Sequence, residues 1–320
     1  MSFKDIKGQD RPIEILKNCI KSSKLTGAYL FLGEEGIGKY LVAKTLAKAV
    51  NCLSSQDDSY DTCSSCLKIE RNQHPDIHFI EPQDSEAIKI EYIRDLKKDI
   101  NLRPYEAKQK VFIINDAHRL TAEAANALLK TLEEPPAHSL IILISSKAAL
   151  LFKTIISRCK IIRFYPLDRA ALTDILKKDY SLNNNLAHFL AYFFEGRIGN
   201  ILRFKDTDIL RDKNRVIDEF TIFKKPDIES LPIQSRDTIR SYLNILASWF
   251  RDIYLIKAGM PHSQLINLDR KDELLRVMNR YSWLELDESL NSISDSLMAL
   301  EQNINVKLLL SNLRIELWRE

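Results

Sequence analysis

The 320-residue sequence has no long apolar run, almost no net charge and few cysteines. No run approaches the roughly 20 apolar residues of a transmembrane helix, and the N-terminal MSFKDIKGQDRP does not resemble a signal peptide. These absences predict a cytoplasmic protein. The net charge is only +3, from 47 basic and 44 acidic residues, so the chain as a whole does not attract DNA. Any contact with nucleic acid must be local and assisted by partners.

Cysteine is scarce, with five residues, and in a cytoplasmic chain this number argues against a framework of disulfides. Three of the five, Cys52, Cys63 and Cys66, lie close together in the sequence. The last two have the C-x2-C spacing that zinc sites use. Two interpretations are open at this level: the cysteines bind a structural metal ion, or they are three buried thiols without a ligand.

Only eight glycines are present, and three of them fall in the segment GEEGIGK. An apolar segment precedes it and a helical pattern follows, which is the arrangement of a phosphate-binding P-loop. Gly33, Gly36 and Gly38 would let backbone N–H groups close around phosphate oxygens, and Lys39 stands where the phosphate-contacting lysine belongs. Tyr40 replaces the Ser or Thr that holds Mg²⁺, and a phenol is too long for that role. The pattern predicts a P-loop without this metal ligand; the alternative is a glycine-rich turn that binds nothing.

Five short apolar segments alternate with helical patterns in the first half of the chain and are expected to be strands. They comprise residues 29–32, 77–80, 111–114, 140–144 and 161–164. Such alternation predicts an α/β fold with a parallel five-stranded sheet and right-handed crossovers. After Pro166 only helical patterns follow. We therefore expect three domains: an α/β P-loop domain at 1–165 with a polar, cysteine-containing insertion at 52–66, a small helical lid at 166–207 and an all-helical domain at 208–320.

The residues after the third expected strand bear on hydrolysis. In a P-loop ATPase an Asp at this place holds the Mg²⁺ shell, and the adjacent Glu orients the attacking water. Here the pair is Asn115 and Asp116: the first is neutral, and the second is a methylene shorter than Glu. Together with Tyr40 these changes make three departures in one site, and they predict that hydrolysis has been lost.

Several segments form a combination that identifies a family. They are FKDIKGQ at 3–9, the P-loop, HPDIHFIEP at 74–82, AANALLKTLEEPP at 124–136, TIISRC at 154–159, and the asparagines at 303 and 305 with the leucines at 308–310. Over nearly the whole chain, and most strongly over residues 1–165, they resemble the AAA+ clamp-loader family of bacterial replication. Within that family they resemble the delta-prime subunits of DNA polymerase III.

The resemblance implies a subunit of a hetero-pentameric ring with gamma/tau and delta subunits, which opens a sliding clamp and loads it on primed DNA. The all-helical domain would be the collar that joins the ring. Arg158 matches the arginine finger that acts in trans on ATP bound by a neighbouring subunit; by itself it could equally be an ordinary solvated arginine. Ser145 and Ser146 match the sensor-1 region, and Asn200 falls where the sensor-2 arginine of the lid is expected.

The departures from the family pattern indicate which type of subunit this is. The motor subunits gamma and tau keep the Walker hydroxyl, both acids and the sensor arginine, whereas this chain has Tyr40, Asn115, Asp116 and Asn200. We expect a non-hydrolysing subunit with weak or no binding of ATP or ADP, without Mg²⁺, that belongs to a DNA-directed DNA polymerase holoenzyme by association. An active gamma/tau-type ATPase is the alternative, and a P-loop protein outside replication would leave Arg158 without a partner.

The family also has a zinc module of four cysteines. Cys52, Cys63 and Cys66 match three of them, and Tyr60 stands at the other position. The candidate substitutes for the missing ligand are Asp57, Asp58, Asp61 and His74. If zinc is present its role is structural, because four-coordinate cysteine-rich sites leave no open position.

Overall fold

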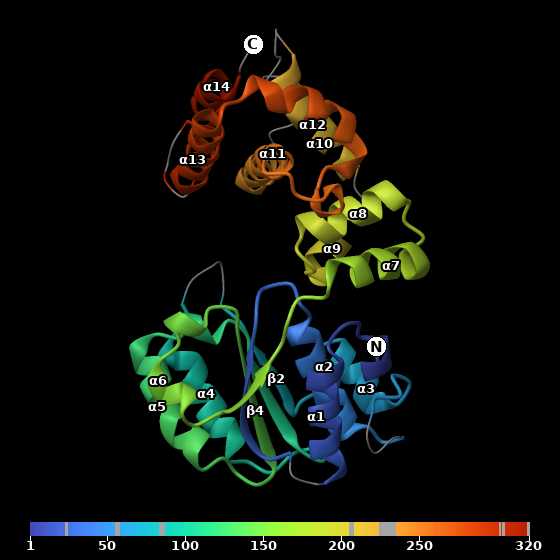
Figure 1. The fold of residues 1–320 in the computed structure, drawn as a ribbon. Coiled ribbons are helices and arrows are strands. Elements are labelled where there is room, and N and C mark those ends of the chain that lie inside the picture. Colours follow the sequence, from blue (N-terminus) through green and yellow to red (C-terminus); the bar gives the residue numbers. More distant parts are fainter. Residues whose placement is uncertain are drawn as a thin grey trace. The chain divides into compact units, whose positions relative to one another are not determined.

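The computed structural model describes residues 1–22, 25–54, 58–82, 87–204, 208–223, 235–300, 302 and 305–318. The chain divides into two compact units (Figure 1). The first contains Met1–Leu167 together with Arg197–Gly199, and the second contains Asp168–Gly196 and Asn200–Glu320. The division into three domains remains a prediction.

The first unit is built on a five-stranded sheet in which all neighbouring strands are parallel, in the order β2-β3-β4-β1-β5. The strands are β1 (Gly27–Leu32), β2 (Ile77–Ile80), β3 (Lys110–Ile114), β4 (Ser139–Ser145) and β5 (Lys160–Arg163). All residues of β3 and β4 are buried, as expected for strands covered on both faces. The predicted α/β fold and parallel sheet are confirmed.

Helices cover both faces of this sheet (Figure 1). They are α1 (Asp10–Lys21), α2 (Lys39–Asn51), α3 (Ser64–Glu70), α4 (Ile90–Ile100), α5 (Ala122–Glu133) and α6 (Lys153–Ile156). Alternate residues of β4 point to opposite sides: Ile142 packs in one core with α1 and α2, whereas Ile141 packs in the other with α4, α5 and α6. The result is a three-layer α/β/α unit.

Helix α5 has clear start and stop signals in its sequence. The Thr121 hydroxyl accepts the N–H of Ala124 at 3.2 Å and so caps the first turn. The helix ends at Glu133, ahead of Pro135 and Pro136, because a proline restricts the residue before it to extended conformations. Buried side chains such as Leu128 hold the helix against the sheet. This fixes the place of Glu133 at the rigid end of α5.

Helix α3 is an element that the sequence pattern did not indicate. The region 52–66 was expected to be a polar insertion, but its last residues begin α3, with Cys63 as the residue that caps its N-terminus. A seven-residue helix is too short to display a full amphipathic period, and its serines favour loops. The sequence therefore gave no helical signal here.

The second unit contains only helices among its described residues. These are α7 (Arg169–Tyr180), α8 (Asn184–Phe193), α9 (Ile198–Phe204, whose first two residues belong to the first unit), α10 (Ile209–Ile217), α11 (Arg236–Lys257), α12 (Lys271–Val277), α13 (Trp283–Ala299) and α14 (Val306–Leu317). Its core forms around α11, where Leu246, Trp249 and Phe250 are fully buried. None of the described helices combines the length and apolar character needed to cross a membrane.

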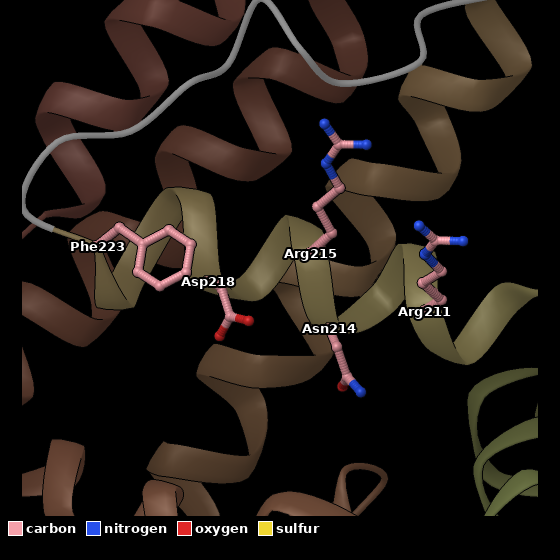
Figure 2. A pocket seen from close by; sticks show the side chains of 5 residues that line it. All are labelled: Arg211, Asn214, Arg215, Asp218 and Phe223. Carbon is pink, nitrogen blue, oxygen red and sulfur yellow. The ribbon is translucent and has the colours of Figure 1, made fainter.

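A hollow of about 720 Å³ lies along α10 in this unit, and its lining is shown in Figure 2. It is lined by Arg211, Asn214, Arg215, Asp218 and Phe223. The two arginines extend from one side of the helix, whereas Asn214 and Asp218 point to the other (Figure 2). The carboxylate of Asp218 is paired with Arg270 at 2.5 Å, so no lining residue offers an uncommitted general base.

Candidate nucleotide site and trans-acting arginine

The P-loop joins the end of β1 to the start of α2, at the carboxyl edge of the sheet where ligands of open α/β folds bind. Three glycines adopt positive φ angles there: Gly33 (153°), Gly36 (78°) and Gly38 (94°). The Gly33 N–H donates to the Ser145 carbonyl at 3.3 Å, and a Cβ on Gly33 would lie 2.5 Å from the Phe164 carbonyl oxygen. The loop thus has P-loop geometry and requires glycine at position 33.

Lys39 is turned back into its own loop. Its side chain is buried, with only 6% of the residue exposed, and Nζ donates to the Gly33 carbonyl at 2.7 Å and to the Glu34 carbonyl. Burial lowers the pKa of Lys39 to about 8, although the nearby carboxylates of Asp116, Glu35 and Glu34 act in the opposite direction. The structure therefore brings Lys39 and Asp116 together, and the ammonium bonds to backbone carbonyls within the loop.

Gly199 closes the loop from the other side. Its N–H donates to the Gly36 carbonyl at 2.7 Å, and both residues belong to the first unit. A Cβ on residue 199 would lie 2.7 Å from the same carbonyl oxygen, so only glycine allows this approach. Sequence register places Asn200 at the sensor-2 position, but two of its neighbours meet the P-loop: Gly199 contacts Gly36, and Nε of Arg197 lies 3.9 Å from the carboxylate of Glu34. With no side chain at this point, no guanidinium can reach a phosphate from residue 199.

Tyr40 does not occupy the place of a metal-binding hydroxyl. Its ring packs against Phe79 of β2, with centroids 6.0 Å apart. Burial, followed by the charge of Glu81, raises the pKa of Tyr40 to about 12. The phenol is therefore neutral and its ring is packed against β2, which agrees with the expectation that it cannot replace a Ser or Thr ligand.

Two further residues of the site follow β3. The N–H of Asn115 donates to the Ile80 carbonyl at 2.9 Å, and Asp116 adopts a left-handed conformation (φ 49°, ψ 46°) that starts a short turn. In that turn the Nδ1 atom of His118 lies 3.2 Å from the hydroxyl of Ser145, the sensor-1 match. The sequence pattern did not identify His118 as a residue of the site. The signal was its place three residues after Asn115, just beyond the carboxyl end of β3.

Arg158 lies after α6 and is 30% exposed. Its Nε atom donates to the Glu133 carboxylate at 2.7 Å, and Nη2 contacts the same oxygen. Its Nη1 atom donates to the Thr154 carbonyl at 3.1 Å and lies 3.4 Å from the Ser157 hydroxyl. No P-loop residue is among these partners in the described part of the chain. Arg158 is thus held at the surface by the ends of α5 and α6.

The three cysteines predicted as metal ligands lie together, with sulfur atoms all within 4.8 Å of one another. Cys52 and Cys66 are buried, and Cys63 is partly exposed. Burial opposes ionisation of Cys63, but N–H groups of Leu53 and Cys66 directed at its sulfur outweigh this and lower its pKa to about 7. Because Zn–S bonds are about 2.3 Å long, tetrahedral ligands lie about 3.8 Å apart. The cluster therefore fits three positions of a tetrahedral metal site.

The described residues do not supply an obvious fourth ligand. Tyr60 is 66% exposed, and Asp57 lies outside the described residues. Asp58 is paired with Lys17 (3.0 Å) and Asp61 with Lys48 (2.8 Å). His74 accepts the N–H of Asp76 at Nδ1 (3.1 Å) and its buried Nε2 atom has no hydrogen-bond partner among the described residues, but the described ligand atoms that gather here are those of the three cysteines.

A parallel sheet of this strand order, with a P-loop after β1 and a second, helical unit, is an AAA+-type P-loop fold. The model of one protein family, described as "DNA polymerase III, delta subunit", matches residues 8–168, so the chain belongs to this family. A second family model, described as "DNA polymerase III, delta subunit, C terminal", matches residues 212–317. The resemblance seen in the sequence motifs is confirmed.

Individual relatives agree with this family. DNA polymerase III subunit delta' of Bacillus subtilis is 28% identical in an alignment of 315 residues. The match covers 95% of this chain and 94% of that protein. The tau subunit of the same organism is 36% identical over 177 residues, 55% of this chain but only 31% of tau. A gamma subunit-related protein of Thermotoga maritima has a similar structure, with a TM-score of 0.52, 21% identity, and coverage of 95% of this chain and 97% of that one. At this identity the structural likeness supports the fold alone.

Proposed function

We propose that this chain is a non-hydrolysing, delta-prime-type subunit of a bacterial clamp loader. The observation that carries the proposal is a P-loop whose groups bond to their own chain. Lys39 donates to carbonyls of the loop, and the Gly36 carbonyl accepts from Gly199. The residues for Mg²⁺ are changed as well, since Tyr40 replaces the Ser or Thr hydroxyl and Asn115 is neutral. Without these Mg²⁺ ligands the site is poorly suited to hydrolyse ATP, which weighs against the alternative of an active gamma/tau-type ATPase.

The proposed role for Arg158 is to act on ATP held by a neighbouring subunit. Its own site lacks metal ligands, so an action in cis would gain little. A guanidinium is a planar fork of donors that matches phosphate oxygens, and lysine does not reproduce it. The surface position of Arg158 at the end of two helices suits a contact between subunits.

The proposed partners are gamma/tau and delta subunits in a cytoplasmic hetero-pentamer, which loads a sliding clamp on primed DNA. Reconstitution tests this directly. The purified chain, mixed with gamma/tau and delta subunits of its own organism, should co-elute with them as one complex in size-exclusion chromatography. Failure to enter any such complex, with the chain folded, would contradict the proposal.

The proposal includes a structural zinc ion held by Cys52, Cys63 and Cys66. When bound, zinc would join the end of α2 to the start of α3, because the cysteines flank these helices. The N–H groups directed at Cys63 support a thiolate at that position. The described residues leave the remaining ligand to a water molecule or to a residue of another segment.

We expect about one zinc ion per chain in protein purified without added metal. Cys63→Ser and Cys66→Ser should each remove it and lower the melting temperature, because the metal stabilises only the folded chain. Cys159→Ser should retain it, since Cys159 is not part of the cluster. Metal analysis and thermal unfolding measure both effects. A stoichiometry near zero would mean that the cysteines are buried thiols. Zinc that survives removal of all three would contradict the ligand assignment.

A further inference from the structure

The contact between Glu133 and Arg158 joins two motifs that the proposed function treats separately. Glu133 is the last residue of α5, in the segment LEEPP, and Arg158 follows α6 in the segment SRC. The Nε–H of Arg158 donates to the carboxylate at 2.7 Å, and Nη2 contacts the same oxygen. We propose that Glu133 is a positioning residue that holds the Arg158 guanidinium in the orientation it needs to act on the neighbouring subunit's nucleotide. This inference rests on the proposed role of Arg158.

The geometry leaves part of the guanidinium available. An arginine has five N–H donors in a fixed plane. Glu133 contacts the donors at Nε and Nη2, while Thr154 and Ser157 lie beside Nη1. Even when each contact uses one donor, an N–H of Nη2 has no acceptor among the described residues. Because 30% of Arg158 is exposed, this donor can meet an oxygen of another molecule.

Glu133 is well placed to limit the motion of Arg158. A free arginine side chain has many rotamers, and ordering it when a partner binds reduces the favourable free energy of that binding. Glu133 stands at the end of a helix whose start is capped by Thr121 and whose body is buried through residues such as Leu128 and Leu132. An anchor on a rigid element orders the guanidinium before the subunits meet.

Glu133 also weakens the positive field of Arg158, since the two charges are opposite. Orientation and charge can be separated by substitution. Glutamine keeps an oxygen that accepts from Nε but removes the negative charge, whereas alanine removes both. Glu134 provides a matched control, because it is the adjacent exposed carboxylate and it makes no ion pair with a basic residue among those described. The two neighbouring acids should therefore behave differently.

The test uses clamp-loader complexes reconstituted with wild-type subunit, Glu133→Ala, Glu133→Gln, Glu134→Ala, Arg158→Ala and the double variant of residues 133 and 158. Exposed ion pairs are worth little, so Glu133→Ala should lower the Arg158-dependent part of the ATPase kcat by about twofold to fivefold. The KM for ATP should not change, because binding of ATP by the neighbour does not need the finger's orientation. Glu133→Gln should restore the rate, and Glu134→Ala should match wild type. The double variant should equal Arg158→Ala.

Each result decides the inference. If Glu133→Ala matches wild type while Arg158→Ala is impaired, Glu133 does not position the arginine, and the proposed function stands. If Glu133→Ala lowers activity further in the Arg158→Ala background, Glu133 has a structural role independent of Arg158. If Gln fails to restore the rate, the charge of Glu133 and not its hydrogen bond is what matters, and the positioning role is contradicted. If Arg158→Ala has no effect in an assembled complex, the proposed function fails and the inference fails with it. Assembly and melting temperature of every variant are measured alongside.

Discussion

Replacing Arg158 with alanine is expected to leave the subunit folded and assembled, but to remove most clamp loading by the reconstituted complex. The side chain is partly exposed and its ion pair with Glu133 lies at the surface, so its contribution to the stability of the fold is small. Its proposed contribution to catalysis is large, because an arginine finger is worth roughly 10³–10⁵ in the rate of the site that it serves. Loss of the whole complex's ATPase should be partial, since other interfaces carry their own fingers.

The measurement is DNA- and clamp-stimulated ATPase, together with clamp loading, in complexes that contain wild-type or variant subunit. Arg158→Lys should behave like Arg158→Ala, because an ammonium cannot reproduce the planar fork. Arg163→Ala is a suitable control, as Arg163 is an exposed arginine of the nearby strand β5. Unchanged ATPase and loading in an intact complex would make Arg158 an ordinary surface arginine.

The isolated protein is expected to hydrolyse ATP no faster than the spontaneous rate, with or without primed DNA. Two independent features lead to this result. Tyr40 and Asn115 do not provide the hydroxyl and the carboxylate that hold Mg²⁺. In addition, Lys39 donates two of its three ammonium N–H groups to carbonyls of its own loop, which leaves one for a phosphate.

Three preparations test this expectation. Wild-type protein and Lys39→Ala should both give background rates, with an active gamma/tau subunit as positive control. A variant with Tyr40→Thr, Asn115→Asp and Asp116→Glu should remain inactive, because the contact of Gly199 with the loop persists. DNA-stimulated turnover that Lys39→Ala abolishes would overturn the assignment as a non-hydrolysing subunit. Turnover gained by the triple variant would show that the metal ligands alone had been missing.

The parts of the fold that were predictable from sequence depend on local patterns. The strand at 77–80 has the predicted bounds, and the strand around 140–144 is one residue longer at each end in β4. Buried strands read as short apolar runs bounded by polar residues, and helices of three turns show a full amphipathic period. Helix α3 was missed because its seven residues are fewer than two full turns.

The parts of the site that sequence did not predict are contacts between distant residues. Gly199 meets Gly36 across 163 positions, and Glu133 meets Arg158 across 25. Neither contact follows from the identity of one residue, because a glycine at the start of a helix usually makes no specific contact and a glutamate at a helix end is usually solvated. The inward turn of Lys39 is equally invisible, since its spacing in the loop is that of a phosphate-binding lysine.

The contact between Gly199 and Gly36 bears on how such a subunit can change during evolution. Any side chain at residue 199, including arginine, would bring a Cβ within 2.7 Å of a backbone oxygen, and a backbone atom cannot move away cheaply. A single substitution of Gly199 by arginine would therefore first distort the loop, before any benefit from the new side chain could appear. Replacement of Tyr40 by Thr, or of Asn115 by Asp, would by itself bring no ATPase activity while Gly199 stays in contact with the loop. On the proposed function, a gain of ATP hydrolysis by this chain would need several coordinated substitutions, whereas a single substitution at Arg158 should change the activity of the complex.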